Sequence, residues 1–260
     1  MSAPLFDTPF VIWTLQRTGG TNLNKHLNMH SGNEKYQDEP FNRRRECGAV
    51  TQAWLDDQNE DALHRSINVI CAKRKNMKHC VERIPWPISE ALIAASHRAG
   101  YAPVFLFRED PMQRLLSMEY AMRTKAWGPK KASENSEDPS AFDKPLDVDA
   151  LIAHETRANN KLKKAWRQLK KAGAAPVAVS YEELYSSDPE EMRTATKRVF
   201  KRLGVPALDE KVIEGIRKTG DQQTRDRYSN FKGRDELQSR LVELPRLPFA
   251  RQKAGVEPTE

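Results

Sequence analysis

An apolar segment that runs directly into a glycine-bearing turn is the feature that most constrains the fold of this chain. Residues 9–15 are rich in strand-forming side chains, the turn Arg17-Thr18-Gly19-Gly20-Thr21 follows at once, and the spacing of apolar residues after the turn is helical. Such a unit gathers backbone N–H groups and the positive end of a helix dipole at one point, which favours binding of a phosphate or sulfate group. In α/β domains, ligands bind beyond the carboxyl ends of the strands, where this turn is expected to lie.

The rest of the chain predicts an alternation of strands and helices. The expected strands are residues 9–15, 67–72, 103–107 and 176–179. The expected helices are residues 21–28, 50–65, 88–99, 111–125, 148–172 and 189–203. This order predicts one P-loop-like α/β domain over residues 1–260, with a central, mainly parallel sheet flanked by helices. We expect residues 128–145 and the tail after residue 217 to be segments that are mobile or that lie on the side where a second substrate binds.

Composition narrows the class of protein and partner. The 260 residues include 43 Lys and Arg against 36 Asp and Glu, and the resulting charge of +7 favours an anionic partner. No apolar run approaches the roughly 18 residues of a membrane span, and the first residues lack the pattern of a secretory signal. The three cysteines are irregularly spaced, which argues against a disulfide framework. We therefore expect a cytoplasmic protein without a membrane span.

A second basic strand end strengthens the prediction of an anion site. Arg108 follows the strand at 103–107, and Ser117 lies nine residues further on, about two turns into the next helix. An arginine and a hydroxyl placed in this way can bind a phosphate. Each feature also has an ordinary interpretation, because Gly19-Gly20 can be a tight connection and Arg108 can pair with a surface acid.

Two other functions are compatible with a basic α/β chain. A P-loop-type small-molecule kinase would need Gly-x-x-x-x-Gly-Lys-Ser/Thr, but here the lysine is missing and Arg17 precedes the glycines. A non-catalytic module that binds polyanions would explain the charge without chemistry. A zinc site made by Cys71, His79 and Cys80 lacks a known ligand spacing, so we expect no metal.

Taken together, the motifs resemble those of sulfotransferases that use 3′-phosphoadenosine-5′-phosphosulfate (PAPS), especially the bacterial sugar-modifying and Golgi-like enzymes. The matching segments are Arg17–Thr21 for the sulfuryl-donor loop, Arg108 with Ser117 for the 3′-phosphate motif, Tyr181–Leu184, Phe200–Pro206 and Ser229–Phe231. They span residues from about 9 to 232, and their order and spacing carry the resemblance more than any single motif does. Two features depart from the family pattern: Gly20 stands where the family has a hydroxyl residue, and Trp13–Gln16 is an atypical approach to the loop.

The resemblance implies transfer of a sulfuryl group from PAPS, as co-substrate, to a hydroxyl of a carbohydrate or small molecule, without a metal and without a specific nucleic-acid partner. Arg17 would act in catalysis by stabilising charge on the leaving phosphate. The residues that would bind PAPS are Arg17, Thr18, Gly19, Gly20, Thr21 and Asn22 at the 5′ end, Arg108 and Ser117 at the 3′-phosphate, and Tyr181 near the adenine.

The resemblance leaves the proton acceptor open among three residues. Glu39, in the sequence Asp38-Glu39-Pro40-Phe41, matches the context of the catalytic glutamate in sugar-modifying relatives and is the first choice. Asp38 is the second, and His79 is the nearest equivalent of the histidine used by the phenol-type branch. Lys73 aligns loosely with a lysine of relatives. The identity of the acceptor, the oligomeric state and the effect of Gly20 on activity are not fixed by these patterns, and a degenerate member that only binds is an alternative.

Overall fold

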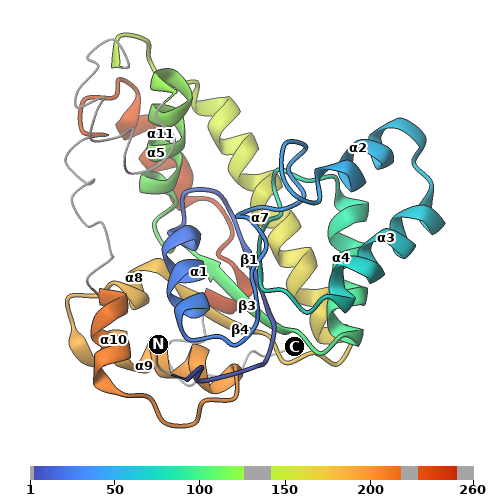
Figure 1. Cartoon of the computed structure of the whole chain (residues 1–260). Helices are drawn as coiled ribbons and strands as arrows, with labels where there is room; N and C mark the ends of the chain where they lie inside the picture. Colours follow the sequence, from blue (N-terminus) through green and yellow to red (C-terminus); the bar gives the residue numbers. More distant parts are fainter. Residues whose placement is uncertain (1–2, 126–141, 218–227, 251–260) are drawn as a thin grey trace.

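The computed structural model describes residues 3–125, 142–217 and 228–250 (Figure 1). Its centre is a sheet of four strands: β1 (Phe10–Thr14), β2 (Met77–Cys80), β3 (Ala102–Phe107) and β4 (Val177–Ser180). The strands are in the order β2-β1-β3-β4, and each neighbouring pair is parallel. The predicted class, an α/β domain with a parallel sheet flanked by helices, is confirmed.

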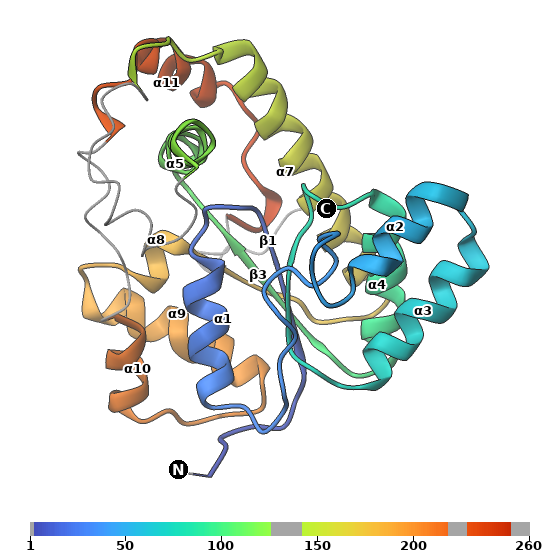
Figure 2. The ribbon, with the colours of Figure 1, turned by 45° about the horizontal axis from the view of Figure 1, so that its top comes forward.

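Both faces of the sheet are covered by helices and buried. Because side chains alternate along each strand, successive residues of β1 belong to hydrophobic clusters on opposite faces. Val11 and Trp13 of β1 belong to one hydrophobic cluster, and Phe10 and Ile12 belong to the other. The first cluster is covered by α3 (Glu60–Ala72), α4 (Trp86–Arg98) and α7 (Val148–Lys171). The second is covered by α1 (Gly20–Met29), α8 (Tyr181–Leu184), α9 (Pro189–Arg202) and α10 (Glu210–Arg217). Figure 2 shows the two groups of helices on opposite sides of the strands.

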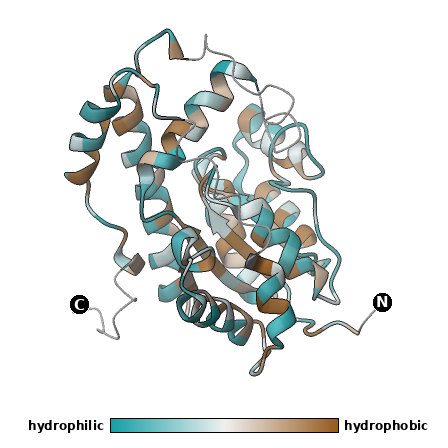
Figure 3. Cartoon of the chain, turned by 90° about the vertical axis from the view of Figure 1, so that its left-hand side faces the viewer, coloured by the Kyte–Doolittle hydropathy of each residue, from teal (hydrophilic) through white to brown (hydrophobic). Residues whose placement is uncertain are grey.

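A third cluster lies beyond the carboxyl end of β3. It joins α5 (Pro111–Thr124), the first turns of α7 and α11 (Arg234–Val242), which lie together at the top of Figure 1. Phe231 of the predicted Ser229–Phe231 motif is buried in this cluster, and the guanidinium of Arg123 lies 5.1 Å from its ring. The colouring of Figure 3 shows that the helices carry both hydrophobic and hydrophilic residues, as expected when one face of each helix is buried.

The prediction of a strand at residues 67–72 is wrong. These residues are the end of α3, and the predicted helix at 50–65 is divided between α2 (Gly48–Asp57) and α3, which begins after the Asn59 cap. The β-branched residues at 67, 69 and 70 suggested a strand, but Leu63, Ile67 and Ile70 are buried at helical spacing whereas Val69 is exposed. The second strand is Met77–Cys80, whose polar Lys78 and His79 concealed it.

This correction moves Lys73 away from the strand ends. Lys73 caps the carboxyl end of α3 and precedes β2, so it lies near the amino end of that strand. Of the segment expected to be mobile at 128–145, residues 128–141 lie outside the described part of the chain. In the tail after residue 217, residues 218–227 and 251–260 also lie outside it, whereas 228–250 include α11. No helix within the described residues is long and apolar enough to cross a membrane.

Candidate functional site

The carboxyl end of β1 is the natural place for a ligand in this sheet. The chain passes from β1 to β2 on one side of it and then returns to β3 on the other side, so the direction of winding changes at β1. Ligands of open α/β sheets bind at such a point, outside the carboxyl ends of the strands. The residues that follow β1, β2, β3 and β4 all lie along this one edge because the strands are parallel.

Hydrogen bonds of two threonine hydroxyls fix the β1–α1 loop (residues 15–19). Thr18 is buried, and its hydroxyl donates to the carbonyl of Leu15 and contacts the hydroxyl of Thr14, which in turn reaches the carbonyl of Leu106 on β3. Gly19 caps α1 with a φ of 80° and without a side-chain hydrogen bond to the cap. The side chain of Thr18 therefore has a structural role. The first backbone N–H groups of α1 have no side-chain cap, so they and the positive end of the helix dipole can bind an anion.

The backbone of the site is strained at two candidate residues. Five non-glycine residues in the described part of the chain have a positive φ, and Gln58, Arg74 and Lys125 among them follow helix ends, where this conformation is common. The other two are Arg17, with a φ of 63°, and Glu39, with a φ of 55°. Positive φ values away from helix ends tend to gather at functional sites.

Residues expected to bind the two ends of one nucleotide lie around this loop. The Nε of Arg17 donates to the Oγ of Ser117 on α5 at 2.8 Å. The guanidinium of Arg108 lies 3.8 Å from the centre of the Tyr181 ring. A Cβ on Gly19 would be 2.7 Å from Cδ2 of that ring, so Tyr181 packs directly on the loop. The structure thus brings Arg17, Ser117, Gly19, Tyr181 and Arg108 into one connected group.

Arg108 has unused capacity to bind an anion. Its Nε is buried and, within the described residues, makes no hydrogen bond. Its neighbour Glu109 is engaged elsewhere, with its backbone N–H donating to Glu182 and its carboxylate accepting from Ser180. Burial raises the pKa of Glu182 and the charge of Arg108 opposes that rise, so Arg108 also has an acidic neighbour, as the alternative interpretation expects.

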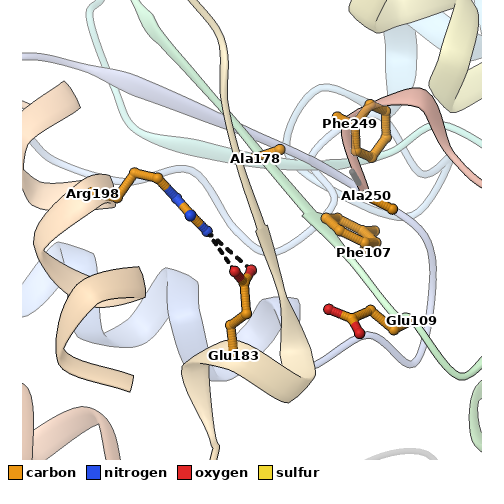
Figure 4. A pocket seen from close by; sticks show the side chains of 7 residues that line it. All are labelled: Phe107, Glu109, Ala178, Glu183, Arg198, Phe249 and Ala250. Atoms are coloured by element: carbon orange, nitrogen blue, oxygen red, sulfur yellow. Dashed lines mark hydrogen bonds and ion pairs between the residues drawn. The ribbon is translucent and has the colours of Figure 1, made fainter. Parts of the chain in front are cut away.

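The second carboxylate of the Tyr181–Leu184 motif has a structural role. Glu183 completes the cap of α8 and accepts 3.0 Å hydrogen bonds from Arg198 of α9 (Figure 4). Figure 4 also shows Phe107 and Phe249 beside this ion pair, around a cavity of about 10 Å³ that is too small for a ligand. Of this motif, Tyr181 is the residue that faces the β1–α1 loop.

Glu39 lies next to a buried lysine that was not among the expected site residues. The Nζ of Lys78 is 3.2 Å from Oε1 of Glu39 and donates to the hydroxyl of Thr21 at 2.9 Å. Asn42 donates to the other carboxylate oxygen at 2.8 Å. Burial would raise the pKa of Glu39, but Lys78, Asn42 and the Cys80 thiol together lower it, so the carboxylate is ionised at neutral pH.

Lys78 reaches Thr21 across the glycine that departs from the family pattern. A Cβ on Gly20 would be 3.1 Å from Cδ of Lys78 and 3.3 Å from Cγ2 of Thr14. Burial lowers the pKa of Lys78, but the interactions with Cys80, Glu39 and Asp38 outweigh burial and raise it. The sequence signal for Lys78 was its position in a Met-Lys-His-Cys run between helices, and the incorrect strand at 67–72 directed attention to Lys73 instead.

The other two candidate bases are placed less well. Asp38 accepts a hydrogen bond from the buried Asn24 at 2.8 Å. His79 is buried between the rings of Trp13 and Phe41, bonds Ser89 at 2.9 Å, and has its pKa lowered by burial to about 3. His79 therefore belongs to the core, whereas Glu39 keeps an ionised carboxylate beside Lys78.

A larger cavity of about 410 Å³ has Arg108 in its wall. It lies between the end of β3, α7 and the segment that follows α11, and its walls include Glu155, Asn159, Leu241 and Leu247. Glu39 and Lys78 are not part of its lining. This volume is within the usual range for a small-molecule site.

Within the described residues, no group of three or more His, Cys, Asp and Glu side chains is arranged to hold a metal ion. The site is instead a cationic one, made by Arg17, Arg108, Lys78 and the amino end of α1. No protein-family model matches this chain, and no curated protein has a significantly similar sequence. The functional interpretation therefore depends on the chemistry of these residues.

Proposed function

We propose that this protein is a sulfotransferase that moves the sulfuryl group of PAPS to a hydroxyl of a carbohydrate or small-molecule acceptor. The main support is the connected group formed by Arg17, Ser117, Gly19, Tyr181 and Arg108 at the change of winding direction. It offers two separate guanidinium groups beside one helix amino end, as a nucleotide with phosphates at both its 3′ and 5′ positions requires.

In the proposed binding mode, the backbone at the start of α1 and the Thr21 and Asn22 side chains hold the 5′-phosphate. Arg108 and Ser117 bind the 3′-phosphate, and Tyr181 lies beside the adenine. Ser117 already contacts Arg17, so the serine links the groups that bind the two ends of the nucleotide. No metal is required for this neutralisation, since the cations and the helix dipole supply the positive charge.

In the proposed reaction, the acceptor oxygen attacks sulfur as the bond between sulfur and the bridging phosphate oxygen breaks. Glu39 accepts the hydroxyl proton, and adenosine 3′,5′-bisphosphate leaves with the electron pair of the broken bond. Arg17 and Lys78 stabilise the negative charge that develops on that phosphate. The lowered pKa of Glu39 keeps it ionised and able to accept the proton at neutral pH.

Titration with three ligands tests this proposal. Adenosine 3′,5′-bisphosphate is expected to raise the melting temperature and to bind with a one-to-one stoichiometry in calorimetry. Arg108→Ala is expected to weaken this binding roughly thirtyfold, whereas Arg65→Ala, which changes an exposed arginine on α3, is the matched control. A larger shift with magnesium-ATP would favour the kinase, and strongly salt-dependent binding of a short oligonucleotide alone would favour the polyanion-binding module.

A further inference from the structure

A buried ionic network lies directly beneath the β1–α1 loop. Its centre is Arg114 of α5, which contacts Glu82 at 3.2 Å and forms a second ion pair with Glu155 of α7. The side chains of these three residues are only 1–3% exposed. Glu82 follows β2, so the network joins three elements that are far apart in the sequence.

The network binds both backbone groups of a single loop residue. The N–H of Gln16 donates to Oε1 of Glu82 at 2.7 Å, and the Nη1 of Arg114 donates to the carbonyl of Gln16 at 3.3 Å. The next residue is Arg17, with its φ of 63°. A left-handed arginine is disfavoured by itself and persists only where its surroundings hold it. Fixing both backbone groups of the preceding residue provides that restraint.

Helix α5 contacts the loop a second time. Arg114 and Ser117 are three residues apart and therefore lie on one side of the helix. Arg114 holds the carbonyl of Gln16, and Ser117 accepts from the guanidinium of Arg17. One helix face thus fixes both the backbone and the side chain of the loop at its cationic residue.

A purely structural explanation accounts poorly for this arrangement. Taking charges out of water is costly, so apolar side chains of similar size can pack a core at least as well as a buried ion pair. Two further polar side chains also face Glu82: the Nε2 of His154 lies 3.6 Å from its carboxylate, and Lys161 donates to its carbonyl. We therefore attribute to this cluster the task of fixing the backbone of Gln16, and not that of stabilising the core by packing.

We propose that Glu82 and Arg114 are positioning residues, which hold Arg17 in the orientation needed to stabilise the leaving phosphate. This inference rests on the proposed sulfotransferase function, since it assigns the purpose of the fixed loop. It separates two tasks of the site: Arg108 binds the nucleotide, whereas the Glu82–Arg114 pair keeps the catalytic arginine oriented.

The test uses Glu82→Gln, Glu82→Ala and Arg114→Lys, with Tyr101→Phe as control. The Tyr101 hydroxyl bonds the carbonyls of Cys71 and Lys75, far from the loop, so its loss lowers stability without touching the site. We expect kcat to fall at least tenfold in Glu82→Ala and Arg114→Lys, and less in Glu82→Gln, which keeps an acceptor for the Gln16 N–H. KM for PAPS and affinity for adenosine 3′,5′-bisphosphate should change less than threefold. The control should retain its kcat.

Hydrogen exchange provides a readout that does not depend on turnover. Amides of residues 16–18 should exchange at least tenfold faster in Glu82→Ala than in the wild type, while those of β3 stay protected. If the loop amides and kcat of a transferring enzyme are unchanged in all three variants, the positioning role is refuted. If the wild type neither binds the bisphosphate nor transfers sulfate, the proposed function fails instead, and faster exchange at residues 16–18 would still show that the pair holds the loop.

Discussion

Replacement of Lys78 by methionine gives the sharpest test of the charge arrangement around Glu39. Methionine keeps most of the aliphatic volume of the lysine but removes the ammonium that lies 3.2 Å from Glu39 and 2.9 Å from Thr21. Removing one partner of a buried ion pair typically costs about 3–5 kcal/mol because the other charge is left unpaired. We expect the lower end, about 3 kcal/mol, because the Glu39 side chain remains 18% exposed to water.

The sign of the pH dependence follows from the pKa of Glu39. In the wild type this pKa lies below its ordinary value of 4.5, so the carboxylate contributes stability above that value and loses it as the pH falls through the lowered pKa. Without Lys78, fewer groups oppose the effect of burial, so the pKa of Glu39 rises. The free-energy difference between wild type and variant should therefore be largest near pH 7 and should shrink as the pH falls toward 4, where Glu39 of the variant becomes protonated.

Urea unfolding at pH 7 and pH 4 measures this difference, with Lys75→Met as control. Lys75 also pairs with a glutamate, Glu34, at 2.8 Å, but that glutamate side chain is 77% exposed, so its loss should matter much less. Adding Glu39→Gln to Lys78→Met should recover part of the lost stability. Equal losses for Lys78→Met and Lys75→Met, or a deficit that is the same at both pH values, would refute the reasoning.

Three further predictions concern the ligand site. Arg108→Ala should weaken adenosine 3′,5′-bisphosphate binding by about 2 kcal/mol, or roughly thirtyfold, as measured by calorimetry; an unchanged Kd would place the 3′-phosphate elsewhere. Gly19→Ala should destabilise the protein in urea by more than Gly173→Ala, because both glycines have a φ near 80° but only Gly19 lies against Tyr181, whereas a Cβ at Gly173 has no neighbour within 4 Å; equal losses would mean that the ring moves freely. Glu39→Gln should lower kcat by about 10²–10⁴ while donor binding persists, and normal turnover would exclude Glu39 as the base.

Much of the fold was predictable because its strongest local signals agree with the tertiary structure. The apolar run before the first turn, the Asp110-Pro111 helix start and the Gly204 helix stop each act locally, and each marks an element boundary within a few residues of that observed. The strand predicted at residues 67–72 was wrong because β-branched side chains occur in strands and in buried helices alike. Packing against the rest of the fold stabilises the helix here. A short strand that carries Lys78 and His79 has no such local signal.

The candidate site was predictable where its residues belong to local motifs at strand ends or on the helices that follow them. Arg17, Arg108 and Ser117 stand at strand ends and on the next helix, where order along the chain already suggests proximity. Lys78 was missed because its importance comes from the β2–β1 pairing, which places it beside Thr21 and Glu39. The left-handed backbone of Arg17 and the hydrogen bond from Gln16 to Glu82 likewise arise only when distant parts of the chain come together, so no local sequence pattern predicts them.

The absence of a side chain at Gly20 lets a residue of another strand reach the start of α1. Lys78 of β2 passes Gly20 and donates to the Thr21 hydroxyl. A Cβ at Gly20 would lie 3.1 Å from Cδ of Lys78, so a larger residue would press on the stem of the lysine. The start of α1 thus has no side chain at Gly20, and the adjacent strand brings the ammonium of Lys78 to Thr21. Replacing Gly20 by serine should consequently shift the stem of Lys78 and lengthen its contact with Thr21, so substitutions at the two positions are expected to have non-additive effects on stability.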